Sequence, residues 1–194
     1  MGSVRIVGGS WRGRRIAFPL HERTRPMKDR VRQAVFNLLG DVEGSHAIDL
    51  FAGPGVLGFE ALSRGAAKAT FFEQHAPTAR RLRQTAELLG AAGVEIHVTD
   101  TLARLAQPQF VQALACEGRP WLVFCTPPYD LYVTAWVRLG PLLEGLMRAA
   151  PRGSRFVVEA DSRFDPRLLP QPDAWEIRHY PPALIAVCWS EKGE

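Results

Sequence analysis

Short apolar segments alternate with helix-like segments along most of this chain, and this alternation limits the fold more than any other feature. The apolar segments predict strands at residues 46–51, 69–73, 95–99, 121–125 and 154–160. The segments between them predict helices at residues 54–64, 77–90 and 131–149, with one or two short helices within 101–116. Apolar strands joined by helices form a parallel sheet that is covered on both faces. The pattern therefore predicts an α/β fold.

The C-terminal end departs from this alternation. Residues 175–180 and 183–190 predict an antiparallel pair of strands around Pro181 and Pro182. The sheet is therefore expected to include one reversed strand near its end. A chain of 194 residues corresponds to one domain with a small appendage, and it can bury a core without a disulfide or a metal.

The N-terminal end supplies the appendage. Residues 4–7 and 14–18 predict a β-hairpin with a glycine-rich turn, and residues 27–39 predict a helix. We therefore expect a basic hairpin-and-helix extension over residues 1–40 and an α/β domain over residues 41–194.

Positive charge is concentrated in that extension. It holds nine basic and two acidic side chains, a net charge of +7, whereas the rest of the chain has a net charge of −3. Arginine outnumbers lysine by 21 to 3, and guanidinium groups bind phosphates bidentately and stack on bases. The extension therefore favours nucleic acid as a partner, and a solvated arginine-rich surface is the alternative. Trp11 lies among the arginines, where it would either stack on an unpaired base or pack the hairpin onto the main domain.

Cysteines, histidines and apolar runs exclude several classes of protein. The three cysteines show no close spacing, unlike those of a disulfide framework or a zinc site. The five histidines form no metal-binding pair, so we expect no metal. No apolar run reaches the ~18 residues of a membrane span, and no apolar leader follows a basic start. We expect a cytoplasmic monomer that does not contact a membrane.

A glycine-rich loop follows the first strand of the α/β domain. Gly53, Gly55 and Gly58 match the pattern G-x-G-x-x-G between a strand and a helix. Small residues at this point allow a ligand to approach the backbone, while the helix N–H groups face the ligand. The pattern alone also fits sites for NAD and FAD, or a tight turn that needs glycine for steric reasons.

Three acidic residues at successive strand ends narrow the choice of ligand. Asp49 lies within the first strand, where a carboxylate suits a cationic group better than a pyrophosphate. Glu73 ends the second strand and would accept hydrogen bonds from ribose hydroxyls, and Asp100 ends the third and would bind an adenine amino group. Each could instead be a cap or a surface charge, and Asp100 is also a good helix N-cap. Together they favour S-adenosylmethionine.

The fourth strand is followed by Thr126, Pro127, Pro128 and Tyr129, and at this point the chain resembles a known family. It is similar to the RsmD-type RNA guanine-N2 methyltransferases, which modify bacterial small-subunit ribosomal RNA. The resemblance covers most of the chain and is carried by the segments VRIVGGSWRGRRIAFP, RTRPMKDRVRQAVFNLL, DLFAGPGVLGFEALSRGA, FFEQ and TPPY.

The resemblance implies a class I methyltransferase fold, which is Rossmann-like, with a seven-stranded, mostly parallel sheet whose last strand is antiparallel. It implies S-adenosylmethionine as methyl donor, no metal, and ribosomal RNA or a small-subunit assembly intermediate as partner. The implied cofactor-binding residues are Asp49, Phe51, Ala52, Gly53, Gly55, Glu73 and Asp100. The implied RNA-binding residues are Arg5, Trp11, Arg12, Arg14, Arg15, Arg25, Arg30 and Arg32. The implied catalytic residues are Thr126, Pro127, Pro128 and Tyr129.

Thr126 departs from the family motif, which has Asp or Asn before the two prolines. In that motif the side chain and the first proline carbonyl accept the two protons of the amine, which aims the nitrogen lone pair at the methyl group. A neutral hydroxyl is a weaker acceptor than a carboxylate, and a loss of about 1.4–4 kcal/mol would slow transfer by about 10- to 1,000-fold. Asp130 either compensates in part or, as we favour, caps the next helix.

Three other functions fit parts of the pattern. The first is an assembly factor, which would bind RNA and S-adenosylmethionine but, because of Thr126, would not transfer a methyl group. Proline-rich loops of this type also serve amino-methyltransferases that act on adenine. A nicotinamide-dependent oxidoreductase fits least, because no acid–base residue accompanies the prolines. We favour methylation of guanine N2 by direct in-line displacement, without a covalent enzyme intermediate.

Overall fold

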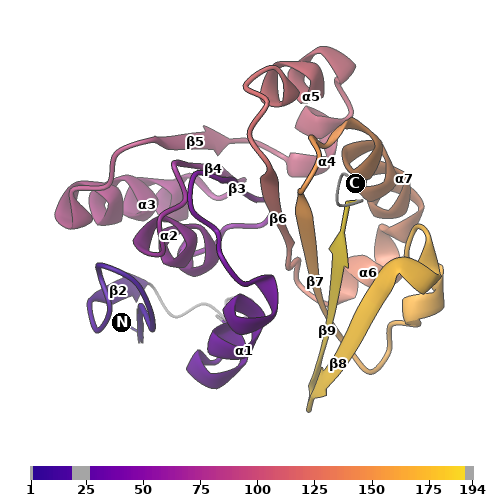
Figure 1. The fold of residues 1–194 in the computed structure, drawn as a ribbon, viewed down its shortest axis with the longest axis horizontal. Helices are drawn as coiled ribbons and strands as arrows, with labels where there is room; N and C mark the ends of the chain where they lie inside the picture. The colour runs from indigo at the N-terminus through magenta and orange to yellow at the C-terminus, as the bar shows by residue number, and fades with distance from the viewer. Residues whose placement is uncertain (1, 19–26, 191–194) are drawn as a thin grey trace.

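The computed structural model describes residues 2–18 and 27–190, and its centre is a seven-stranded sheet in the order β5-β4-β3-β6-β7-β9-β8 (Figure 1). The sheet consists of β3 (His46–Asp49), β4 (Lys68–Glu73), β5 (Val94–Val98), β6 (Trp121–Cys125), β7 (Arg155–Asp161), β8 (Trp175–Tyr180) and β9 (Ala183–Trp189). A separate hairpin pairs β1 (Gly2–Arg5) with β2 (Arg15–Phe18).

Helices cover both faces of the sheet. They are α1 (Asp29–Leu39), α2 (Val56–Ser63), α3 (Ala76–Leu89), α4 (Thr101–Leu105), α5 (Pro108–Ala115), α6 (Asp130–Thr134) and α7 (Trp136–Ala149), with short 3-10 turns at Pro166–Leu168 and Pro172–Ala174. Strand β9 is antiparallel to both β7 and β8, while the pairs among β3 to β7 are parallel. The predicted α/β fold with one reversed strand is confirmed.

Several predicted elements differ in their bounds by a few residues: the first hairpin strand, for example, is Gly2–Arg5 and not residues 4–7. Two differences lie close to the predicted site. The single helix expected over residues 131–149 is divided at Ala135, whose backbone leaves the helical region, into α6 and α7. The apolar spacing runs through this break, so periodicity could not reveal it. The first strand of the domain ends at Asp49, because Leu50 already turns toward the glycine loop.

Alternate residues of the central strands feed two hydrophobic clusters, one on each face. Along β6, Leu122 and Phe124 belong to the first cluster, while Trp121 and Val123 belong to the second. The first cluster also contains buried side chains of the hairpin, α1, α2 and α3, namely Ile6, Ile16, Val31, Val35, Leu57 and Leu82. The segment expected as an extension therefore shares its hydrophobic core with the α/β domain.

Helix α2 packs closely on β4 because Gly58 has no side chain. A Cβ at this position would lie 2.3 Å from Cε1 of Phe71, a ring that is fully buried. We expect Gly58→Ala to lower the free energy of unfolding by about 1–3 kcal/mol, since the overpacked helix must shift. Urea denaturation should show a lower midpoint with an unchanged m-value.

Gly145 provides the matched control within α7. A Cβ there meets no atom within 4 Å, so Gly145→Ala should be neutral or should stabilise the protein by about 0.5–1 kcal/mol. Equal destabilisation by the two substitutions would contradict the close packing of α2.

Candidate active site

The glycine loop is fastened to the end of β4, the neighbouring strand of the sheet. Ala52 N–H donates to the Phe72 carbonyl at 3.0 Å, and Gly53 N–H donates to Oε2 of Glu73 at 2.9 Å. Gly55 has φ of +77°, and a Cβ there would lie 2.4 Å from Cδ2 of Leu82. A side chain at this position would therefore be strained as well as crowded. The loop thus leaves its backbone open at the carboxyl end of the sheet, where ligands of such sheets bind.

Asp49 is the most constrained acidic residue of this edge. Its side chain is buried, and its Oδ1 has no hydrogen-bond partner among the described residues. The pKa of Asp49 is raised to about 7, mainly by burial; backbone N–H groups of Gly58 and Phe51 oppose this rise, and the nearby Glu73 adds to it. A buried carboxylate oxygen without a hydrogen-bond partner is unfavourable, so Oδ1 of Asp49 fits a ligand that brings a positive charge or a hydrogen-bond donor.

The other two predicted acids, Glu73 and Asp100, both accept hydrogen bonds from backbone N–H groups. Glu73 accepts from Gly53 N–H through Oε2 and from His75 N–H at 2.7 Å through Oε1, and so fixes the glycine loop. Asp100 is the N-cap of α4, because its Oδ1 accepts from Leu102 N–H at 2.8 Å. The capping reading of Asp100 is confirmed. The binding roles of Glu73 and Asp100 stay predictions.

The segment Thr126–Tyr129, which we call the proline lip, follows β6 at the same edge. Pro127 is buried, Thr126 and Tyr129 are partly buried, and Pro128 is exposed. The Tyr129 hydroxyl donates to Oε1 of Glu159 on β7 at 3.0 Å. The lip is thus joined to a carboxylate that sequence reasoning did not single out. A charged residue inside an otherwise apolar strand was the only signal for it.

Two residues near the lip connect it to the neighbouring structure. The Tyr132 hydroxyl donates toward the carbonyls of Cys125 at 3.2 Å and Glu159 at 2.9 Å, which ties the ends of β6 and β7 together. Asp130 is the first residue of α6, and its carboxylate pairs with Arg163 at 3.1 Å. The expectation that Asp130 caps this helix is wrong, because no side-chain cap bond forms and the carboxylate turns to Arg163.

Most of the predicted RNA-binding arginines lie on the surface. Arg12, Arg14, Arg15 and Arg30 are exposed, and Arg5 is exposed while it pairs with Asp29 at 2.6 Å. A hollow of about 280 Å³ between the hairpin and α3 is lined by Arg14, Arg15 and the further arginine Arg81. Arg25 lies outside the described residues.

Trp11 is partly buried and packs against the first hydrophobic cluster. Its backbone N–H donates to Oγ of Ser63 at 2.9 Å, and Oγ of Ser63 donates to the Gly8 carbonyl at 2.6 Å. These contacts fasten the hairpin turn to the end of α2. The packing role of Trp11 is therefore confirmed, and base stacking by its remaining surface stays a prediction.

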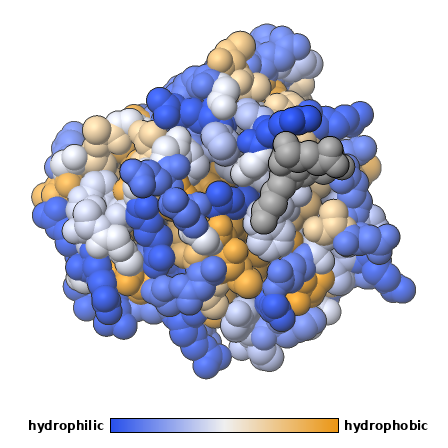
Figure 2. Space-filling view, in the orientation of Figure 1, coloured by the Kyte–Doolittle hydropathy of each residue, from blue (hydrophilic) through white to orange (hydrophobic). Residues whose placement is uncertain are grey.

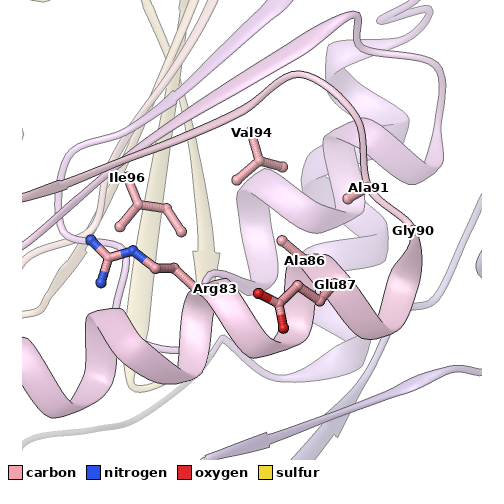
Figure 3. A pocket seen from close by; sticks show the side chains of 7 residues that line it. All are labelled: Arg83, Ala86, Glu87, Gly90, Ala91, Val94 and Ile96. Carbon is pink, nitrogen blue, oxygen red and sulfur yellow. The ribbon is translucent and has the colours of Figure 1, made fainter.

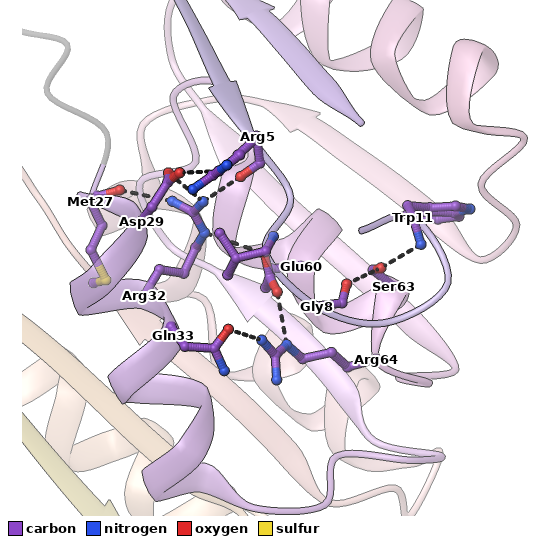
Figure 4. Close-up of polar contacts among 11 residues, drawn as sticks. Arg5, Gly8, Trp11, Met27, Asp29, Arg32, Gln33, Glu60, Ser63 and Arg64 are labelled. Atoms are coloured by element: carbon purple, nitrogen blue, oxygen red, sulfur yellow. Dashed lines mark hydrogen bonds and ion pairs between the residues drawn. The ribbon is translucent and has the colours of Figure 1, made fainter. Parts of the chain in front are cut away.

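Arg32 is a correction to the predicted RNA-binding set. Its side chain has no exposed surface and lies in a buried ion cluster with Glu60, Arg64 and Asp29 (Figure 4). Nε of Arg32 lies 3.3 Å from Oε2 of Glu60, and its Nη1 donates to the Met27 carbonyl at 2.8 Å. The guanidinium is occupied by protein groups, so it is not available to RNA in this structure.

Glu60 is the centre of this buried ion cluster. Its Oε1 accepts from Arg64 at 2.8 Å, and its Oε2 accepts from Val7 N–H at 2.8 Å as well as from Arg32. One carboxylate on α2 thus holds the hairpin and α1 at the same time. An acidic residue within a buried helix was the only sequence signal for this role.

Another hollow on the described surface lies away from this sheet edge. It has a volume of about 430 Å³ between α3 and the edge strand β5, and Val94, Ile96, Arg83 and Glu87 border it (Figure 3). Its lining includes one arginine and one glutamate but none of the predicted site residues. We therefore assign the candidate active site from the chemistry of its residues and not from the volume of a pocket.

The molecular surface is mostly polar, with a small apolar area on the face shown in Figure 2. Hydrophilic side chains cover most of the face in view, and hydrophobic ones gather near its middle (Figure 2). None of the helices in the described part of the chain is long and apolar enough to cross a membrane. Within residues 2–18 and 27–190, no group of three or more potential ligand side chains is arranged to hold a metal ion.

Comparison with known proteins supplies a family. The family model described as Conserved hypothetical protein 95 matches residues 4–178. Ribosomal RNA small subunit methyltransferase D of Escherichia coli K12 is 38% identical over 130 residues, which cover 66% of this chain and 61% of that protein. The match thus spans about three fifths of the length of this curated relative.

Solved structures agree with this placement. The structure of yhhF from Escherichia coli has a TM-score of 0.76 at 27% identity, and the match covers 98% of this chain and 100% of that one. An RNA methyltransferase from Salinibacter ruber, in complex with S-adenosyl-L-homocysteine, has a TM-score of 0.60 at 18% identity over 88% of this chain and 95% of that one, and it supports the fold. The chain therefore belongs to the Conserved hypothetical protein 95 family, which is the RsmD family, and it has the class I methyltransferase fold.

Proposed function

We propose that this protein is an S-adenosylmethionine-dependent RNA methyltransferase that modifies N2 of a guanine in small-subunit ribosomal RNA. The observation that carries the proposal is the buried, unpartnered Oδ1 of Asp49 beside the glycine loop, at the same sheet edge as the proline lip. The name of the Escherichia coli relative and the S-adenosylhomocysteine in the Salinibacter ruber structure support the same reading.

The residues at this edge fit the cofactor. Asp49 would hold its positively charged methionine end, and Phe51, Ala52, Gly53 and Gly55 would line that end with backbone. Glu73 would accept from the ribose and Asp100 from the adenine amine. When bound, the cofactor supplies an activated methyl group on a positively charged sulfur.

The proline lip would present the acceptor base. Tyr129 offers a ring on which an unpaired guanine can stack, and the Pro127 carbonyl can accept one proton of the exocyclic amine. These contacts would aim the nitrogen lone pair along the line of displacement. The exposed arginines of the hairpin and of α1 would bind the RNA backbone. The carbonyl of Leu39, at the end of α1, accepts from Arg155 at the start of β7 at 2.7 Å, which fastens α1 to the sheet.

Incubation with labelled S-adenosylmethionine tests the proposal directly. The substrate would be small-subunit particles or their RNA lacking the modification, and mass spectrometry would identify the product nucleoside. N2-methylguanosine supports the proposal, whereas methylated adenosine would assign the protein to another class of amino-methyltransferase. Binding of RNA and cofactor without transfer would identify an assembly factor.

The basic surface makes a prediction about salt. Replacing Arg12, Arg15 and Arg30 together with Gln should lower affinity for the RNA about 10- to 100-fold, because three phosphate contacts are lost. The slope of log affinity against log salt should fall by about 2. Filter binding at several salt concentrations measures both quantities.

A matched triple variant controls for charge alone. Arg119, Arg148 and Arg152 lie near the opposite ends of the strands, before β6, at the end of α7 and before β7. Replacing these three with Gln removes the same charge and should change the affinity and the slope much less. Equal effects of the two triple variants would contradict a localised RNA surface.

A further inference from the structure

We propose that Glu159 on β7 is a further catalytic residue, which accepts a proton of the target amine in place of the acidic or amide side chain that Thr126 has replaced. This inference rests on the proposed function and adds a residue to its site. It explains how a chain with a threonine at the first position of the motif can still activate a weakly nucleophilic amine.

The strand register places Glu159 beside Thr126. Strands β6 and β7 are parallel, and Cys125 is the Cα partner of Val158. Thr126 is the first residue after β6 and Glu159 is the next residue of β7, so continuing this register places the two side by side at the ~4.8 Å spacing of neighbouring strands. A carboxylate on the adjacent strand can therefore reach the same space that a side chain at position 126 borders.

Side-chain alternation directs Glu159 to the appropriate face. Val158 and Ala160 belong to the second hydrophobic cluster, whereas Val157 belongs to the first, so Glu159 points to the side of Val157. On β6, Phe124 also belongs to the first cluster. This is the face on which α1, α2 and the hairpin lie, and therefore the face next to the arginines.

One carboxylate oxygen of Glu159 accepts a hydrogen bond from Tyr129, and the other accepts none from the described residues. Oε1 accepts from the Tyr129 hydroxyl at 3.0 Å, and the described residues provide no hydrogen bond to Oε2. The carboxylate is partly buried, and this burial raises its pKa while the Tyr129 hydrogen bond lowers it. A desolvated carboxyl group with a raised pKa is well suited to accept a proton from a developing cation.

The chemical step balances with these groups. The N2 lone pair of guanine forms a bond to the methyl carbon as the carbon–sulfur bond breaks, and the bonding pair stays on sulfur as a neutral thioether. The amine nitrogen, now positively charged, gives one proton to Oε2 of Glu159. The Pro127 carbonyl accepts a hydrogen bond from the other proton. The carboxyl group then releases its proton to water.

A purely structural role for Glu159 makes a different prediction from a catalytic one. A substitution at Tyr129 distinguishes the two roles. If Glu159 only positions Tyr129, then removing the hydroxyl in Tyr129→Phe should cost as much activity as Glu159→Gln. If Glu159 acts on the amine, Tyr129→Phe should lose less than about threefold, because the stacking ring is kept. Glu159→Gln should lose about 10- to 100-fold in the single-turnover rate, since the amide cannot accept the proton.

Rescue by position 126 provides the decisive measurement. Thr126→Asp should restore most of the rate in the Glu159→Gln background, and it should change the wild-type rate much less. Glu176→Gln, a substitution on β8, should leave the rate unchanged and controls for loss of a carboxylate. Calorimetry with S-adenosylmethionine should show unchanged affinity in all these variants.

The possible failures are distinguishable. A Glu159→Gln variant as fast as wild type, equal losses in Tyr129→Phe and Glu159→Gln, or no rescue by Thr126→Asp would overturn the role of Glu159 and leave the proposed function standing. A wild-type protein that transfers nothing while Thr126→Asp transfers would also overturn it, because Glu159 would not compensate. Absence of cofactor binding in wild type would overturn the proposed function itself.

Discussion

Replacing Glu60 with Ala is expected to lower the free energy of unfolding by about 3–5 kcal/mol. The substitution leaves the guanidinium of Arg32 buried without its carboxylate partner, and it removes the acceptor of Val7 N–H. The cost comes mainly from the uncompensated buried charge and not from the lost attraction. Urea denaturation followed by circular dichroism would measure the change.

Glu144 offers a control with the same spacing to arginine. Glu144 pairs with Arg148 at 3.6 Å on the exposed side of α7, just as Glu60 pairs with Arg64 four residues on. Glu144→Ala should cost less than about 1 kcal/mol, because exposed pairs are screened by water. If Glu60→Ala were as mild as Glu144→Ala, the buried ion cluster would not be the anchor that we describe.

Asp49→Asn is expected to weaken binding of S-adenosylmethionine by about 2–5 kcal/mol, or about 30- to several-thousand-fold. The amide has nearly the shape of the carboxylate but cannot pair with the positively charged methionine end. Calorimetry would measure the affinity, and thermal unfolding without cofactor would show whether the variant folds. Asp173→Asn, an exposed substitution in the turn before β8, should leave the affinity unchanged.

The same carboxylate makes the affinity depend on pH. The pKa of Asp49 is raised to about 7 without ligand, and the proposed pairing requires its ionised form. Affinity should therefore fall as the pH drops below 7, by up to tenfold per pH unit, and it should reach its maximum above pH 7 until the amino group of the ligand loses its proton. Asp49→Asn should abolish the acidic limb. A wild-type affinity that is constant between pH 5.5 and 7 would show that Asp49 does not pair with the ligand.

Much of the fold follows from local sequence patterns. The buried strands at residues 46–51 and 121–125 have few alternatives, because continuous apolar segments between helices must lie inside a parallel sheet. The reversed strand follows from a tight connection at Pro181 and Pro182, which is too short for a crossover helix. The buried strands and the reversed strand depend on residues that are close together in the chain, and for that reason they can be predicted from the sequence.

Parts of the site depend instead on contacts between distant segments. Arg32 was predicted to bind RNA because it lies in a basic stretch, yet its position on α1 turns it toward Glu60, 28 residues away. Glu159 stands 30 residues from Tyr129, and only the register of two strands brings them together. Asp130 looked like a helix cap until the fold placed Arg163 beside it. Charge and spacing alone cannot choose among such distant partners.

The shared first hydrophobic cluster has a consequence for anyone who shortens this protein. Val4, Ile6, Ile16 and Val35 are all less than 9% exposed and pack against side chains of the α/β domain. A fragment that starts after residue 40 would expose the partners of these side chains to water as a contiguous hydrophobic surface. Such a fragment would aggregate when expressed, so its failure to methylate RNA would say nothing about how the arginines contact the substrate.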